Sequence, residues 1–141
     1  MPIRIATPDD LPHIMELAAA SYEGRPVALA RPYIEWAMKQ SDRLCLIGVD
    51  TAGMASVATH YGFERKARMD ILVGRRTPIA PLEAFRMVKI MVDWAGKMGA
   101  KKFRLDADTG VDFGPFALRL GGYRVDSPRY DIPLNPENSD V

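Results

Sequence analysis

Cysteine and histidine are scarce in this chain of 141 residues. It contains one cysteine, Cys45, and two histidines, His13 and His60. A single cysteine excludes an internal disulfide bond and a cysteine-rich zinc site. Two histidines are too few for the usual histidine-based metal centres. We therefore expect no metal, and we expect Cys45, between two leucines, to be a buried apolar residue rather than a nucleophile.

The chain also lacks an excess of charge and a long apolar run. Its 19 Lys and Arg residues face 18 Asp and Glu residues, giving a formal net charge of +1. This balance argues against nucleic acid as a partner, because such binders usually carry a basic excess. No apolar stretch approaches the ~20 residues that cross a bilayer. Since no secretory signal pattern opens the chain either, we expect a cytoplasmic protein without a membrane partner.

What is present indicates a folded protein. The sequence is 48% hydrophobic and 26% charged, a composition typical of globular domains. The length suits one domain. We expect a single domain over residues 1–134. We expect a frayed tail over residues 135–141, where a proline and two asparagines follow the last apolar residues.

The first forty residues predict a short strand and two helices. Residues 3–5 alternate in polarity, as in a strand. Thr7 and Asp10 then stand where a helix N-cap and its capping-box partner are expected. The helix should end near Gly24, which suits a left-handed C-terminal position. A second helix is predicted over residues 31–39.

The rest of the chain predicts three antiparallel strands, a long helix, a strand, a short helix and a final pair of strands. In that order the ranges are 43–49, 54–61, 67–74, 81–98, 101–106, 115–120, 123–125 and 130–134. Turn-forming residues at 50–53 separate the first two strands. A helical crossover should make the strands at 67–74 and 101–106 parallel and adjacent.

This order of elements resembles the GNAT N-acetyltransferase superfamily over nearly the whole chain. Three segments carry the resemblance: Ile-Arg-Ile-Ala-Thr-Pro-Asp-Asp-Leu-Pro at 3–12, Asp-Ile-Leu-Val-Gly at 70–74 before a loop and the long helix, and Leu-Arg-Leu-Gly-Gly-Tyr at 118–123. The resemblance implies an α+β fold of layered type. Its central sheet would be mixed but mostly antiparallel, with helices on both faces.

The resemblance also implies transfer of an acetyl group from acetyl-CoA to an amine. The cofactor would lie in a split between the fourth and fifth strands, with its pantetheine arm along Ile71, Leu72 and Val73. Its pyrophosphate would bind at the start of the long helix, where free N–H groups and the helix dipole attract anions. The residues implied there are Gly74, Arg75, Arg76 and Thr77.

The chain departs from the family pattern at two places. Its phosphate loop has no glycine after Gly74, and Pro78 and Pro81 each lack an N–H donor. The arginines beside Gly74 offer charge-assisted bonds to phosphate instead. The family's general-acid tyrosine falls at Leu118, and its customary asparagine falls near Val111.

Three residues are candidates for proton transfer. Asp70 lies mid-strand between apolar residues, where a partly buried carboxylate suits general-base work. An exposed or salt-bridged Asp70 is the alternative. His60 is a second candidate base, against a hydrogen-bonded or exposed edge histidine. Tyr123 is a candidate acid, although the family uses this position for packing.

Two further interpretations stay open. The chain has either acyl-transfer activity or a GNAT-like fold that serves only as a binding or assembly module, because fold does not fix function. A homodimer formed through sheet edges or C-terminal strands is also considered. The basic clusters at 64–68 and 101–104 are either a solvated sheet edge or a groove for an acidic partner.

Overall fold

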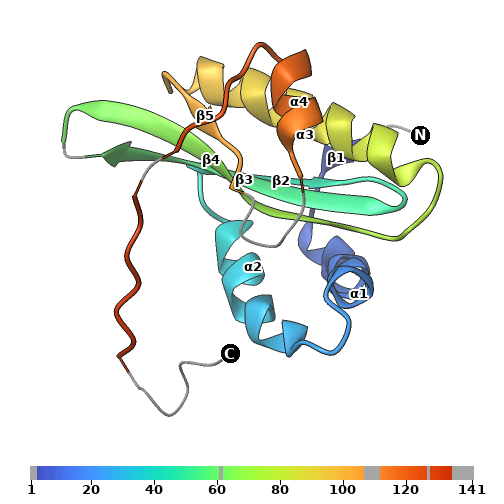
Figure 1. Ribbon diagram of the computed structural model, residues 1–141. Coiled ribbons are helices and arrows are strands. Elements are labelled where there is room, and N and C mark those ends of the chain that lie inside the picture. Colours follow the sequence, from blue (N-terminus) through green and yellow to red (C-terminus); the bar gives the residue numbers. More distant parts are fainter. Residues whose placement is uncertain (1–2, 61, 107–111, 127, 135–141) are drawn as a thin grey trace.

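A five-stranded sheet forms the centre of the protein. The computed structural model describes residues 3–60, 62–106, 112–126 and 128–134. The strands lie in the order of the chain, antiparallel except for the last pair, which is parallel (Figure 1). Their bounds are β1 Arg4–Ile5, β2 Arg43–Ile47, β3 Thr51–His60, β4 Glu64–Gly74 and β5 Phe103–Arg104. The predicted meander and the parallel crossover are confirmed.

Helices cover both faces of the sheet. In Figure 1, α1 and α2 lie on one face, and α3 and α4 lie on the other. Their bounds are α1 Leu11–Ser21, α2 Arg31–Ala37, α3 Ala80–Lys97 and α4 Gly114–Arg119, with 3-10 turns at Pro8–Asp10 and Val27–Ala30. None of the helices in the described ranges is long and apolar enough to span a membrane. The mixed, mostly antiparallel sheet with helices on both faces is the predicted fold class.

Alternation along the strands divides the core into two layers. On β2, Cys45 and Ile47 pack toward α1 and α2, whereas Leu44 and Leu46 pack toward α3. Successive strand residues point to opposite faces, so each strand serves both layers. From α3, Met87 is fully buried in the second layer. The two helical layers therefore hold β4 between them, and β4 is the strand that positions the site.

The entry to the first helical region follows the predicted chemistry. The Asp10 carboxylate accepts the backbone N–H of Thr7 at 2.8 Å. The same carboxylate pairs with Arg4 at 2.6 Å. The Arg4 hydrogen bond, followed by the bond from Thr7, holds the pKa of Asp10 well below its usual range. The helix start predicted at Thr7 is confirmed.

Two local predictions are wrong. The turn predicted at 50–53 lies earlier, because Thr51 and Ala52 pair with Gly74 and Val73 as part of β3. Ladder bonds and burial outweigh the local turn preference there. The strands predicted at 123–125 and 130–134 do not form in the described residues. Tyr130, Ile132 and Leu134 are 82–97% exposed, and Pro133 lacks a ladder donor.

Candidate functional site

The first feature of the site is a split between β4 and β5. The two strands pair only at Ala67 with Phe103 and at Arg68 with Arg104. β4 then continues to Gly74 with no described β5 residue paired beside it. A strand edge without a partner presents N–H and C=O groups to a ligand.

A β-bulge places Asp70 where this split begins. Met54 pairs with Ile71 and Ala55 pairs with Met69, so Asp70 is the extra residue on β4. A bulge re-aims side chains and disrupts the ladder locally. The Asp70 carboxylate approaches Arg43, whose guanidinium lies over Trp36 of α2, so it points to the face that carries α1 and α2.

The Asp70 carboxylate is only half satisfied. Its Oδ1 accepts a hydrogen bond from Arg68 Nε at 2.8 Å. Its Oδ2 lies 4.0 Å from Arg43 Nε. Both Asp70 Oδ2 and Arg43 Nε are buried without a hydrogen-bond partner, and the Asp70 side chain is 6% exposed. Buried polar groups normally find a partner, so this pair has unused bonding capacity.

Two aromatic side chains of α2 border the pair of charges. The rings of Tyr33 and Trp36 lie 5.9 Å apart between centroids. The guanidinium of Arg43 lies 5.4 Å from the centre of the Trp36 ring, within cation–π range. Both rings remain about half exposed. The arrangement provides a flat apolar wall next to a buried carboxylate.

The opposite end of β4 leads into the start of α3. Among the described residues, the backbone N–H groups of Arg76, Ile79 and Leu82 donate to no acceptor. Free donors of this kind, together with the helix dipole, attract anions. Pro78 and Pro81 supply no N–H, as predicted. The Arg76 side chain is exposed and makes no ion pair with a described residue.

The other predicted phosphate residues are engaged within the protein. Arg75 forms an ion pair with Glu16 and lies 3.9 Å from Asp50 Oδ1. The Thr77 hydroxyl donates to Asp50 Oδ2 at 2.9 Å and accepts the N–H of Ala80 at 3.2 Å. These side chains brace the loop.

A buried glutamate that sequence reasoning missed holds the turn between β2 and β3 against the start of α3. Glu83 is 6% exposed and accepts the N–H groups of Val49 and Asp50 at 3.1 and 2.9 Å. A Cβ at Gly48 would lie 2.4 Å from the Glu83 carboxyl carbon, so a side chain at this position would displace the Glu83 carboxyl group. The sequence signals available for this contact were Glu83 in the first turn of α3 and Gly48 in the β2–β3 hairpin.

The predicted pantetheine residues offer their backbone, since their side chains are used in packing. Ile71 and Val73 pack toward α1 and α2, and Leu72 packs toward α3. Gly74 is occupied on both sides, because Ser21 Oγ accepts its N–H at 2.7 Å and donates to its carbonyl at 2.9 Å.

Of the other candidate acid and base residues, only Tyr123 has a described side chain. His60 ends β3, and its side chain lies outside the described part of the structure. Tyr123 is 68% exposed, and no hydrogen bond of the described residues links it to Asp70. Leu118 is 72% exposed on α4. The position near Val111 lies outside the described residues.

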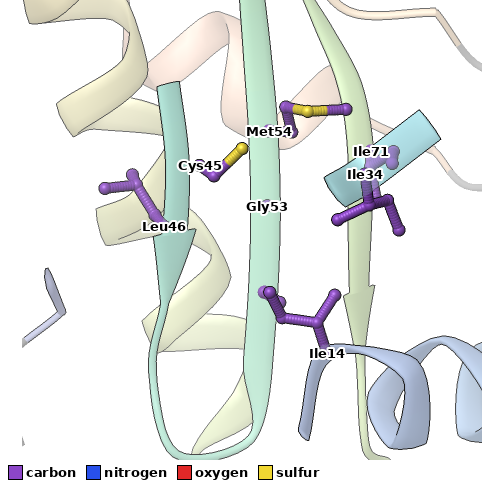
Figure 2. A pocket seen from close by; sticks show the side chains of 8 residues that line it. Ile14, Ile34, Cys45, Leu46, Gly53, Met54 and Ile71 are labelled. Carbon is purple, nitrogen blue, oxygen red and sulfur yellow. The ribbon is translucent and has the colours of Figure 1, made fainter. Parts of the chain in front are cut away.

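A small apolar gap lies between the sheet and the two N-terminal helices, apart from the split. In Figure 2, side chains of α1, α2 and strands β2 to β4 converge on it. Its lining residues are Ile14, Ile34, Cys45, Leu46, Ala52, Gly53, Met54 and Ile71. Burial raises the pKa of the Cys45 thiol to about 11, so it stays protonated near neutral pH. The gap belongs to the core, and the prediction for Cys45 is confirmed.

Comparisons with known proteins identify the fold. No family model and no curated protein matches the sequence. Among solved structures, an aminoglycoside 6′-N-acetyltransferase from Acinetobacter haemolyticus superposes with a TM-score of 0.74 at 14% identity, covering 94% of this chain and 98% of that one. Glucosamine-6-phosphate N-acetyltransferase from Arabidopsis thaliana gives 0.71 at 14% identity, covering 95% and 98%.

A third structure is similar to the same extent. A putative acetyltransferase from Agrobacterium tumefaciens gives a TM-score of 0.73 at 14% identity, covering 94% of this chain and 99% of that one. The chain therefore has the fold of the GNAT N-acetyltransferases. At this level of identity the likeness concerns the fold, and activity has to be argued from the site.

Proposed function

We propose that the protein is an N-acetyltransferase that uses acetyl-CoA as acetyl donor and an amine as acceptor. One observation carries the proposal: a stretch of β4 without a described β5 partner connects a half-satisfied carboxylate, Asp70, with the N–H groups at the start of α3 that donate to no described acceptor. The first end suits an amine, and the second suits a phosphate. A thioester held along the strand would lie between them.

The residues present fit the donor substrate. The backbone of residues 71–73 would hold the pantetheine arm along the open edge of β4. The N–H groups of Arg76, Ile79 and Leu82 would hold the pyrophosphate, with the Arg76 guanidinium as the charged partner. Arg75 would keep its bond to Glu16 and support the loop from behind.

The chemistry requires one proton acceptor and a good leaving group. Acetyl-CoA supplies an acetyl thioester. The amine nitrogen attacks the carbonyl carbon, so a C–N bond forms while the C–S bond breaks and the thiolate leaves. The nitrogen gives its proton to Asp70, directly or through water, and solvent protonates the thiolate. A thiol pKa near ~8.5 lets the thiolate depart without the tyrosine that Leu118 replaces.

A non-catalytic binding module is the second candidate function. The observation that favours it is the engagement of Arg75 and Thr77 by Glu16 and Asp50, which removes side chains that the phosphate site was predicted to use. On this interpretation the loop is a structural brace.

Binding and turnover of acetyl-CoA separate the two candidates. Acetyl-CoA is titrated into the full chain by calorimetry, and release of free thiol is then followed with a mixture of small amines. Micromolar binding with amine-dependent thiol release supports the enzyme. Absence of binding at millimolar acetyl-CoA overturns it, and binding without release under any amine favours the module.

A further inference from the structure

The fold brings two separate basic clusters of the sequence together. Arg68 on β4 pairs with Arg104 on β5 in the parallel ladder. Paired residues of neighbouring strands point to the same face. The residues before them, Ala67 and Phe103, pack against α3. Arg68 and Arg104 therefore point to the opposite face, which carries α1 and α2.

Two lysines extend this row along the same face. The backbone N–H of Ala67 donates to the carbonyl of Lys102 at 2.9 Å, which continues the ladder beyond β5. Lys66 and Lys102 each precede an arginine of the row by two positions, so alternation gives them the same face. We call Lys66, Arg68, Lys102 and Arg104 the cationic tetrad.

The cationic tetrad has few counterions. Among the described residues, only Arg68 has an ion pair, its 2.8 Å bond to Asp70. Asp106 adds a longer-range attraction to Arg68, and Glu64, at the start of β4, makes no ion pair. Three of the four cations are exposed, and Lys66 is half-buried. Like charges on paired strand positions destabilise a sheet, and a bound anion removes that repulsion.

The cationic tetrad adjoins the unsatisfied pair of Asp70 and Arg43. Arg68 belongs to the tetrad and also donates to Asp70 Oδ1, while Asp70 Oδ2 lies 4.0 Å from Nε of Arg43, whose guanidinium lies over the Trp36 ring of α2. This oxygen is buried and has no hydrogen-bond partner. An N–H donor from a ligand would satisfy it. This face therefore combines a set of donors for an anion with a buried, unpartnered acceptor suited to an amine.

Spacing limits the size of the ligand. Adjacent strands lie ~4.8 Å apart, so Asp70 and the Arg68–Arg104 row lie within roughly 10 Å of each other. A small molecule spans that distance. The phosphate site at the start of α3 is separate, because Arg68 and Gly74 lie about 20 Å apart along β4 at ~3.3 Å per residue.

We propose that the acceptor is a small anionic amine, whose amino group donates to Asp70 Oδ2 while its phosphate or carboxylate lies on the cationic tetrad. The inference rests on the proposed function, because it names the amine that receives the acetyl group. It gives the two basic clusters one role that neither has alone.

Matched pairs of amines test the inference without knowledge of the natural substrate. Ethanolamine is compared with phosphoethanolamine, and butylamine with 4-aminobutyrate. Each is titrated into the full chain by calorimetry, and each is assayed as acceptor with acetyl-CoA. We expect the anionic member of each pair to have a roughly tenfold higher affinity or a roughly tenfold higher kcat/KM for acetylation. The first pair reports on phosphate and the second on carboxylate.

A matched pair of double variants locates the preference. Lys102→Gln with Arg104→Gln removes half of the cationic tetrad. Arg65→Gln with Lys101→Gln removes the same charge from the positions just before Lys66 and Lys102. Both side chains are exposed, and alternation points them away from the face of the tetrad. We expect the first variant to lose the preference for anionic amines and the second to retain it.

Three results overturn the inference. The first is equal affinity and kcat/KM for the neutral and the anionic amine of each pair, and the second is an equal loss of the anionic preference in both double variants. The third is that neither anionic amine binds. Failure of the proposed function looks different. In that case acetyl-CoA does not bind, whereas phosphoethanolamine or 4-aminobutyrate still binds and the Lys102 and Arg104 substitutions still weaken it.

Discussion

The two ends of β4 differ in whether their charged groups have partners within the protein. At the Gly74 end, the carboxylates of the protein are engaged by donors of the protein: Glu83 accepts the N–H groups of Val49 and Asp50, and Asp50 accepts the Thr77 hydroxyl. At the Asp70 end, two buried atoms, Asp70 Oδ2 and Arg43 Nε, have no hydrogen-bond partner among the described residues, although Asp70 pairs with Arg68 and Arg43 pairs with Asp42. The same strand thus joins a satisfied scaffold to an unsatisfied face.

This difference indicates that one end of β4 supports the loop before α3 and that the other end binds a ligand. Satisfied charges hold the loop before α3 in one conformation, so that its free N–H groups keep a fixed direction. Unsatisfied charges raise the free energy of the ligand-free protein and are relieved by a ligand. Substitutions of the engaged carboxylates at the first end should therefore change stability, and substitutions of the unsatisfied groups at the second end should change activity.

The largest expected effect is at the unsatisfied end. Asp70→Asn keeps the side chain's shape but removes its capacity to accept a proton. We expect kcat to fall roughly 10²–10⁴-fold, the usual contribution of a general base. Affinity for acetyl-CoA, whose proposed site lies elsewhere along β4, should be unchanged. Steady-state kinetics and calorimetry measure both, with the exposed Asp93→Asn as control. An unchanged kcat would exclude Asp70 as the base.

At the Gly74 end, loss of an engaged carboxylate should lower the free energy of unfolding. Glu83→Ala leaves the N–H groups of Val49 and Asp50 without their acceptor, and we expect a loss of about 1–3 kcal/mol in the free energy of unfolding. Urea denaturation measures it, with the exposed Glu35→Ala as control.

A second substitution sharpens this prediction. Gly48→Ala brings a Cβ against the Glu83 carboxyl group, so it should destabilise the wild type more than the Glu83→Ala variant. Equal losses in the two backgrounds would show that the close approach does not explain the glycine.

The smallest effect concerns pH and the N-terminal ion pair. The lowered pKa of Asp10 means that its contribution to stability is present above the ordinary carboxyl pKa of about 4. It is lost as the pH falls toward the lowered folded-state pKa. The melting temperatures of wild type and Asp10→Asn should therefore differ above pH ~4 and converge in stronger acid. A difference that grows on acidification would contradict this.

Local signals were sufficient for most of the fold. The cap at Thr7 and the long helix between two strands are properties of short segments, and the structure confirms them. The prediction of the final strands is wrong because the alternation in 130–134 is typical of a strand but does not indicate a strand with which it would pair. In the described structure that segment has no partner.

The site depends more on tertiary contacts. Asp70 was a candidate from its place mid-strand, but its bulge and its unpaired oxygen follow from the register of β3 and the approach of Arg43. Nothing local to Arg75 indicated that Glu16, 59 positions away, would engage it. The convergence of Arg68 with Arg104 likewise requires the parallel pairing of β4 and β5.

The central claim is that acetyl-CoA binds along β4 with its phosphates at the free N–H groups beside Arg76. Calorimetric titration of acetyl-CoA into wild type, Arg76→Ala and Arg75→Ala tests it most directly. We predict that the wild type binds, that Arg76→Ala weakens binding roughly tenfold, about 1.4 kcal/mol, and that Arg75→Ala changes it less than about twofold. No binding to the wild type, or a larger loss for Arg75→Ala, would contradict the claim.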